Sequence, residues 1–145
     1  SLINAMNKVQ SQNVSSTASI SMAASVEALN GDQSFILSNN ESFLRRRNLV
    51  VKHLNETPGL SCRTPEGAFY VFASCKGVLG KTTESGKKLL TDGDFMDYLL
   101  EEVGVAGVQG SAFGLEGFFR ISYATSDSIL EDACQRIKTA CSKLS

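Results

Sequence analysis

The sequence predicts an α+β fold in which a small sheet is covered by helices. Long segments with apolar residues at helical spacing occupy both ends of the chain, and short apolar segments with alternating patterns lie between them. Turn residues separate the two kinds of segment. In chain order the pattern gives three helices, a pair of strands, a helix, two strands and a final helix.

The first third of the chain is predicted to be helical. We expect helices at residues 2–12, at 17–29 and from about 32 or 34 to 55, with a Ser/Thr-rich loop at 13–19. Asn30 and Gly31 tolerate the left-handed conformation of a helix C-terminus and therefore end the second helix. The third helix has an apolar stripe made by Phe43, Val50, Val51 and Leu54. Its arginine run at 45–47 is expected to form a solvated face.

Short strands are predicted in the middle of the chain. A turn at 64–67 separates the apolar segments 60–62 and 68–72, and the second of these has aromatic residues at alternating positions. The pair predicts a β-hairpin, or two strands of one antiparallel sheet. Further along we expect a helix at 92–103, a short buried strand at 104–108 and a glycine-rich loop at 109–114.

The most informative stretch is GFFRISYATS at 117–126, which is typical of a strand of five to seven residues that ends where a helix starts. Side chains alternate between the two faces of a strand. One face would carry Phe119, Ile121 and Tyr123, and the other Phe118, Arg120, Ser122 and Ala124.

A final amphipathic helix is expected from about residue 126 to 143. Ser128 and Glu131 have the spacing of a capping box at its start. Cys134 and Cys141 lie on its apolar face, where we expect them to be small core residues. The chain has four cysteines without a CxxC pair and one histidine, which argues against a zinc site. We interpret the cysteines as reduced thiols of a cytoplasmic protein.

Composition excludes several other classes of protein. The hydrophobic content of 42% and charged content of 20% are typical of a globular domain, and the net charge of −1 favours neither nucleic acid nor an anionic membrane. No apolar run is long enough to span a membrane, and no signal-peptide pattern is present. The chain starts at Ser1 rather than Met, directly in a helical pattern, which indicates a piece of a longer protein.

Arg120 is the candidate functional residue that the pattern itself identifies. An arginine inside an apolar strand is costly to bury, because it is always charged and each of its donors needs an acceptor. It could form a structural ion pair, with Glu116 for example, or lie at a strand edge open to water. Alternatively, its planar fork could hold the carboxylate or phosphate of a ligand through two parallel hydrogen bonds.

Several segments together resemble one family. They are EALNG (27–31), RRRNLVV (45–51), PGLSC (58–62), TPEGAFYV (64–71), GSAFG (110–114) and FRISYA (119–124). In this order and spacing they resemble the C-terminal part of the pyridoxal-phosphate-dependent class I aminotransferases of fold type I, in particular the bacterial enzymes that act on aspartate. The resemblance covers essentially the whole chain.

The resemblance implies a role for Arg120, because the arginine of the FRISYA strand holds the α-carboxylate of the amino acid substrate in this family. It also implies pyridoxal 5′-phosphate as the cofactor, bound by a large domain. In the family the Schiff-base lysine lies in a Ser-x-x-Lys motif just before the point where this sequence begins, and none of the lysines here lies in that context. We therefore expect one substrate contact here, no catalytic or cofactor-binding residue, and no activity of the chain alone.

The resemblance also divides the chain into two parts. Residues 1–33 would be the end of the large domain and connecting helices, and residues 34–145 would be the small C-terminal domain. The loop near Ser15 and Ser16 departs from the family's Ser-Asn-Pro. In the family this loop approaches the neighbouring subunit's active site, so the resemblance implies that these two serines are pocket residues. Phe69 and Phe113 are expected to line the substrate pocket or to support it. A cytoplasmic homodimer with active sites at its interface is implied.

The resemblance predicts transfer of an amino group between L-aspartate and 2-oxoglutarate, giving oxaloacetate and L-glutamate. Two alternatives stay open from the residues. The first is an aminotransferase of other specificity, for prephenate or aromatic amino acids, because the residues that recognise the substrate side chain lie largely outside this sequence. The second is a non-enzymatic module that uses Arg120 to hold a carboxylate.

Overall fold

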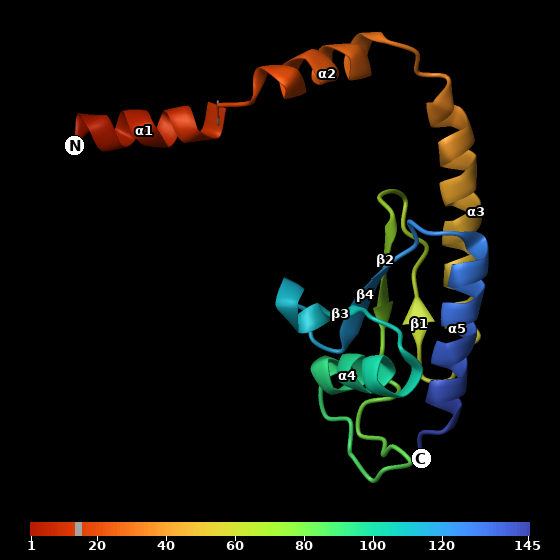
Figure 1. Cartoon of the computed structure of the whole chain (residues 1–145). Coiled ribbons are helices and arrows are strands. Elements are labelled where there is room, and N and C mark those ends of the chain that lie inside the picture. The colour runs from red at the N-terminus through yellow and green to blue at the C-terminus, as the bar shows by residue number, and fades with distance from the viewer. Residues whose placement is uncertain (14–15) are drawn as a thin grey trace. The chain divides into compact units, whose positions relative to one another are not determined.

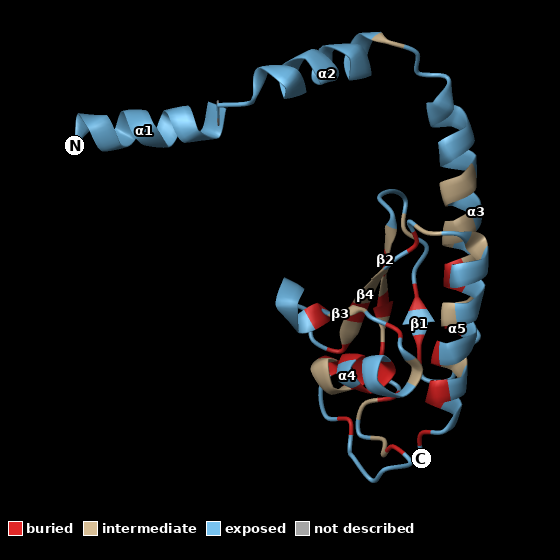
Figure 2. Cartoon of the chain, viewed as in Figure 1, coloured by how far each residue is buried: buried red, intermediate tan, exposed pale blue. Residues whose placement is uncertain are grey.

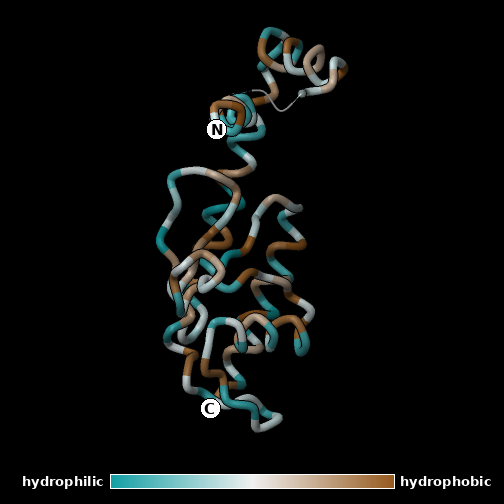
Figure 3. The backbone as a smooth tube through the Cα atoms, turned by 90° about the vertical axis from the view of Figure 1, so that its left-hand side faces the viewer, coloured by the Kyte–Doolittle hydropathy of each residue, from teal (hydrophilic) through white to brown (hydrophobic). Residues whose placement is uncertain are grey.

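The computed structural model describes residues 1–13 and 16–145, and the contacts within it divide the chain into two units, Ser1–Ser38 and Asn39–Ser145. The first unit contains α1 (Leu2–Asn13), α2 (Ser19–Asn30) and the start of α3 (Phe35–Asn55). α1 and α2 have no buried residue (Figure 2). Several of their exposed side chains are nevertheless large and hydrophobic, such as Leu2, Ile3, Met6, Ile20 and Leu29. Figure 3 colours the backbone of both helices by residue hydropathy, and hydrophobic segments appear in each.

The helix boundaries in this unit agree with the sequence pattern, but one cap differs from it. Gly31 ends α2 as expected, yet its φ of −76° and ψ of −168° are extended rather than left-handed. Its N–H donates to the carbonyl oxygen of Glu27 at 2.7 Å, which satisfies one of the last carbonyls of the helix.

The second unit contains a four-stranded antiparallel sheet, which confirms the α+β prediction (Figure 1). Its strand order is β1 (Ser61–Cys62), β2 (Tyr70–Ser74), β4 (Phe118–Ser122), β3 (Val108–Gln109). β1 and β2 are antiparallel neighbours, as the hairpin prediction required. The strand predicted at 104–108 is wrong except for its last residue, because pairing starts only at Val108, and part of the predicted loop is the 3₁₀ turn η1 (Gly110–Phe113).

The core lies on one face of this sheet. Val71 and Ala73 of β2 and Phe119 of β4 point into it and are fully buried. They form one cluster with residues of α3, of α4 (Asp92–Val103) and of α5 (Asp127–Ser142), including Val50, Leu54, Phe95, Leu99, Leu130 and Ile137. The rings of Phe95 and Phe119 meet edge to face with centroids 5.5 Å apart. This packing fixes β4, the strand that carries Arg120.

The helices α4 and α5 begin with different caps. Thr91 and Asp94 form a capping box at α4, where each side chain accepts from the other residue's backbone N–H. α5 is capped by Ser126, whose side chain accepts from the N–H of Ile129. The predicted box of Ser128 and Glu131 is wrong, because the helix already begins at Asp127 and Ser128 lies inside its first turn.

The arginine run of α3 is only partly a solvated face. Arg45 and Arg46 each donate through Nε to one carboxylate oxygen of Asp127, at 2.8 and 2.9 Å, and so tie α3 to the start of α5. Arg47 donates to the carbonyl oxygen of Pro65 at 3.0 Å. The run therefore holds three segments of the second unit together, which a charge pattern read from one helix could not indicate.

Replacing Asp127 with asparagine should destabilise the fold at neutral pH but not in strong acid. Hydrogen bonds from Arg45 and Arg46 hold the pKa of Asp127 below its usual 3.8. A carboxyl group whose pKa falls on folding stabilises the fold above the unfolded pKa and loses this contribution as pH falls through the folded value. Urea unfolding should show a difference between wild type and Asp127→Asn at pH 7 that disappears near about pH 2. A difference of equal size at both pH values would contradict this explanation.

All four cysteines are free and buried, and Cys134 and Cys141 of α5 are core residues as expected. Burial raises the pKa of Cys62, Cys75 and Cys134 to about 11 and that of Cys141 to about 12. Because the thiolate is the nucleophile, these thiols should be inert near neutral pH while the chain is folded.

Alkylation tests this expectation directly. At pH 8 iodoacetamide should leave the folded chain unmodified, whereas the chain unfolded in guanidinium should take up four carbamidomethyl groups, one for each cysteine. The intact mass of both samples gives the count. Rapid modification of any cysteine in the folded chain would mean that its pKa or its burial is not as described.

In residues 1–13 and 16–145, no helix combines the length and the apolar character needed to cross a membrane. Within the same ranges, no three His, Cys, Asp or Glu side chains gather as a group that could hold a metal ion.

Candidate carboxylate-binding site

The alternation predicted for the Arg120 strand is present in β4. Phe119 and Tyr123 are buried on the core side, and Ile121 packs against the core from the same side. Phe118 and Arg120 are half-buried and Ser122 is exposed on the other side. Arg120 therefore projects from the face of the sheet opposite the core.

Both structural explanations of Arg120 that the sequence left open are wrong. β4 lies between β2 and β3, with Phe72 and Val108 paired on either side of Arg120, so this residue is not on an edge strand. Among the residues that the structure describes, Glu116 and the other carboxylates form no ion pair with Arg120, and its side chain donates no hydrogen bond to the chain. Its donors remain accessible to a ligand.

Two aromatic rings support the guanidinium of Arg120. Its Cζ atom lies 4.5 Å from the ring centroid of Tyr70 and 4.5 Å from that of Phe113. A cation over an aromatic face is attracted by the ring's quadrupole, and the contact leaves the N–H groups at the guanidinium edge free. The arrangement thus orients a planar fork of donors without using any of them.

Tyr70 reaches this place because β2 pairs with β4 in a fixed register, with Tyr70 opposite Ser122. The turn before β2 is held by Tyr123, whose hydroxyl donates to the carbonyl oxygen of Ala68 at 2.8 Å. Ala68 has a φ of 62°, which is strained for a residue with a Cβ. The ring centroids of Phe69 and Tyr70 lie 4.3 Å apart, so Phe69 contacts a ring of the site but does not line the Arg120 cavity.

Phe113 comes from the turn η1, which precedes β4. Its ring contacts Arg120 directly and meets the Phe72 ring edge-on at 6.0 Å. Phe113 was expected as a pocket residue and here lies against Arg120. Tyr70, by contrast, was not singled out by the sequence, although the alternating aromatics of 68–72 were the signal that could have identified it.

The site opens into a cavity of about 210 Å³. Arg120 and Tyr70 line it together with Ala106, Gly107, Val108, Ile121 and Ser122. This volume is below that of pockets for drug-sized ligands and suits a small acid.

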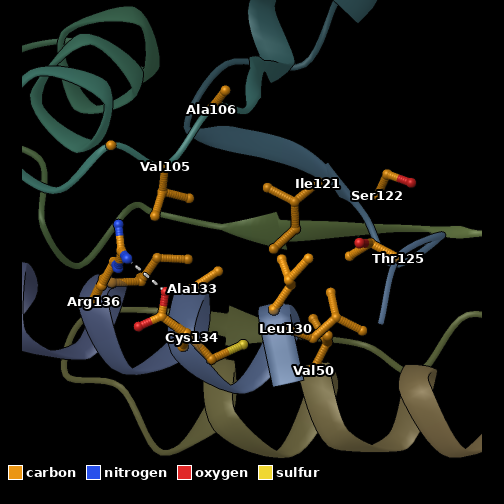
Figure 4. A pocket seen from close by; sticks show the side chains of 14 residues that line it. Val50, Val105, Ala106, Ile121, Ser122, Thr125, Leu130, Ala133, Cys134 and Arg136 are labelled. Atoms are coloured by element: carbon orange, nitrogen blue, oxygen red, sulfur yellow. Dashed lines mark ion pairs between the residues drawn. The ribbon is translucent and has the colours of Figure 1, made fainter. Parts of the chain in front are cut away.

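A larger cavity of about 420 Å³ is lined mainly by residues of α5, β4 and the segment 104–106 (Figure 4). Its wall is formed largely by apolar side chains of α5 and β4, such as Leu130, Ala133 and Ile121. The arginine here, Arg136, forms an ion pair with Asp132 at 2.7 Å and donates to the carbonyl oxygen of Val103. Its charge is satisfied by the protein, in contrast to that of Arg120.

The two serines that the resemblance implied as pocket residues do not appear among the described residues of this site. Ser15 lies outside the described residues. Ser16 belongs to the unit Ser1–Ser38, where it is exposed and has a φ of 57°.

Comparison with known proteins gives one family. A model of the class I and II aminotransferases matches residues 1–137. The aspartate aminotransferase of Rhizobium meliloti strain 1021 is 61% identical over 144 residues, which are 99% of this chain and 35% of that protein. The aspartate/prephenate aminotransferase of Cereibacter sphaeroides is 52% identical, again over 99% of this chain and 36% of the relative. The chain thus spans about a third of the length of these curated relatives.

Solved structures agree with this result. The crystal structure of the aspartate aminotransferase from Rhizobium meliloti matches 99% of this chain and 36% of its own, with a TM-score of 0.88 and 61% identity. The Thermus thermophilus aspartate aminotransferase with maleate matches 95% of this chain and 34% of its own, with a TM-score of 0.76 and 33% identity. An aromatic aminotransferase from Pyrococcus horikoshii covers 78% of this chain with a TM-score of 0.64 and 38% identity.

Proposed function

The chain belongs to the class I and II aminotransferase family, and from this premise we propose that it is the C-terminal part of an aspartate aminotransferase. In this proposal Arg120 binds the α-carboxylate of the substrate. The reaction would transfer an amino group from L-aspartate to 2-oxoglutarate, giving oxaloacetate and L-glutamate.

The observation that carries the proposal is the state of the Arg120 side chain. Its guanidinium rests on Tyr70 and Phe113, and no acceptor among the described residues takes its donors. A charged fork that is held in place but unpaired is suited to a carboxylate, which can accept two parallel hydrogen bonds. Holding the α-carboxylate would fix the substrate's orientation, so the contribution of this chain is positional.

The names of the relatives support a dicarboxylate substrate. The Rhizobium relative is named for aspartate, and the Thermus enzyme was solved with maleate, which carries two carboxylates. The second candidate function is transamination of prephenate, because the Cereibacter relative is named for both substrates. The aromatic aminotransferase from Pyrococcus has the same fold, so the fold alone does not select the substrate side chain.

The family implies pyridoxal 5′-phosphate as the cofactor, but the residues around Arg120 do not fit it. This cofactor needs a lysine amine for covalent attachment, and no lysine lines either the Arg120 cavity or the larger cavity beside it. We therefore propose that the cofactor is bound by residues outside this sequence. A homodimer in the cytoplasm is part of the same proposal.

The test is an assay of the natural polypeptide with pyridoxal 5′-phosphate, aspartate and 2-oxoglutarate, in which oxaloacetate is measured. Oxaloacetate formation supports the proposal, and faster oxaloacetate formation when prephenate replaces 2-oxoglutarate as the amino acceptor would favour the second candidate. The 145-residue chain alone should form no oxaloacetate. If the natural polypeptide binds maleate but transfers no amino group, the enzyme assignment is wrong and Arg120 belongs to a carboxylate-binding module.

A further inference from the structure

We propose that Asp92, in the first turn of α4, is a positioning residue for the carboxylate site. Its side chain fixes the turn η1 and thereby holds the Phe113 ring under the guanidinium of Arg120. This inference rests on the proposed function of Arg120 and adds to it a residue that does not touch the substrate.

The carboxylate of Asp92 is not needed to cap its own helix. The capping box at the start of α4 is made by Thr91 and Asp94. Asp94 accepts hydrogen bonds from the backbone N–H groups of Leu90 and Thr91 and is only partly buried. Asp92 is only 2% exposed, and a buried carboxylate is costly unless hydrogen bonds satisfy it. Its burial therefore needs another explanation.

The partner of Asp92 is the turn that carries Phe113. Its Oδ2 atom accepts a hydrogen bond from the backbone N–H of Ser111 at 2.6 Å. Ser111 is the second residue of η1, and the first N–H groups of a helical turn have no acceptor within the turn. The N-terminus of α4 also favours a negative charge at this position. The carboxylate of Asp92 in α4 and the N–H of Ser111 in η1 are therefore hydrogen-bond partners that would otherwise both lack one.

The same turn is also fixed at both of its ends. An added Cβ at Gly110 would collide with the carbonyl oxygen of Leu115 and lie 2.8 Å from Cβ of Phe118, so the turn starts pressed against β4. Gly114 ends it in the left-handed conformation, with its N–H directed to the carbonyl oxygens of Gly110 and Ser111. Between these ends, Asp92 is the side chain that holds the turn from outside.

Phe113 depends on this support because its own packing is limited. Its side chain is 49% exposed, and its ring contacts Phe72 and Arg120 rather than the core. If η1 were free to shift, the ring would no longer hold the guanidinium, and Arg120 would have to be ordered when the substrate binds. Preorganisation of this kind lowers the entropic cost of binding. Loss of Asp92 should therefore weaken carboxylate binding without changing the chemical step.

The experiment uses the natural polypeptide and maleate as the probe, with calorimetric titration. Asp92→Ala should raise the dissociation constant for maleate roughly tenfold, the range expected for losing one hydrogen bond to a charged group. Asp92→Asn should stay within about twofold of wild type, because its amide oxygen can accept the same N–H. Asp94→Ala is the matched control, since it removes a carboxylate that lies in the same helical turn but does not contact η1. In the transamination assay, Asp92→Ala should raise KM for aspartate and leave kcat nearly unchanged.

Two further measurements separate positioning from general destabilisation. Amide hydrogen exchange at residues 110–114 should accelerate in Asp92→Ala and not in Asp94→Ala. In a Phe113→Ala background, Asp92→Ala should cause little further loss of maleate affinity, because the two act through one ring. The Phe113→Ala variant also reports on the ring if Asp92→Ala fails to fold.

The outcomes distinguish this inference from the proposed function. If wild type binds no maleate, the proposed function fails, and the positioning role fails with it. If wild type binds maleate and Asp92→Ala binds it equally well, only the positioning role is overturned. An Asp92→Asn variant as weak as Asp92→Ala would also overturn it, because the hydrogen bond to Ser111 would then not be the cause. Additive losses in the double variant would mean that Asp92 does not act through Phe113.

Discussion

Replacing Arg120 with alanine should raise the KM for aspartate, and the dissociation constant for maleate, by roughly a hundredfold or more in the natural polypeptide. Removing one partner of a hydrogen-bonded charge pair costs about 2–5 kcal/mol, and the substrate carboxylate would lose both of its parallel bonds. Folding should be affected far less, because Arg120 has no hydrogen bond or ion pair among the described residues. Steady-state kinetics and calorimetric titration give the two constants, and thermal unfolding checks the fold.

Two variants make this result specific. Arg120→Lys keeps the charge but loses the planar fork, so it should recover only part of the affinity. Arg136→Ala removes an arginine beside the neighbouring cavity whose charge is already paired with Asp132, and it should leave KM close to wild type. Equal effects at Arg120 and Arg136 would mean that a general loss of positive charge, rather than a specific contact, weakens binding.

Phe119→Ala should destabilise the second unit by about 3–5 kcal/mol, the range for truncating a buried aromatic side chain. Phe119 is 0% exposed and meets Phe95 edge to face, so the truncation leaves a cavity where the sheet packs on α4. This loss is a large part of the stability of an ordinary domain, which is about 5–15 kcal/mol. Urea unfolding of the chain, followed by far-UV circular dichroism, measures it.

Phe35→Ala is the matched control for this prediction. Phe35 begins α3 and is 56% exposed, so the same truncation should change the free energy of unfolding by about 0.5 kcal/mol or less. Similar losses for Phe35 and Phe119 would show that the core is not where the structure places it.

The sequence predicted the parts of this fold that depend on local pattern. The α+β class, the helices at 92–103 and 126–143 and the two faces of the Arg120 strand follow from apolar spacing, and the structure has them. It missed the cap of α5, because Ser126 and Ser128 are equally good caps and only the backbone decides where the helix begins. The strand predicted at 104–108 was nearly all wrong, since pairing depends on what lies beside it.

In the candidate site, too, the local pattern was predictable from the sequence and the contacts between distant segments were not. Arg120 was conspicuous because a charge interrupts an apolar strand, and its alternatives could be stated in advance. The rings beneath it come from β2 and η1, and no local pattern shows that these segments meet at Arg120. Asp92 gave no signal, because acidic residues are common in the first turn of any helix. Its contact with Ser111 depends on where α4 ends up relative to η1.

The strand order β1-β2-β4-β3 also determines how this unit can fold. The β1–β2 hairpin is local and can form early. β4 can pair with β2 only after α4 and the loops on either side of α4 have been synthesised and have folded back toward the sheet. Closing this long loop costs chain entropy before any contact between β4 and β2 has formed. Folds rich in contacts between residues far apart in the sequence fold slowly. Arg120 lies in β4, the central strand that joins the sheet late. The carboxylate site therefore cannot exist while only the β1–β2 hairpin has formed. Maleate affinity is therefore expected to be among the last properties to recover on refolding, after the hairpin and the helices have formed.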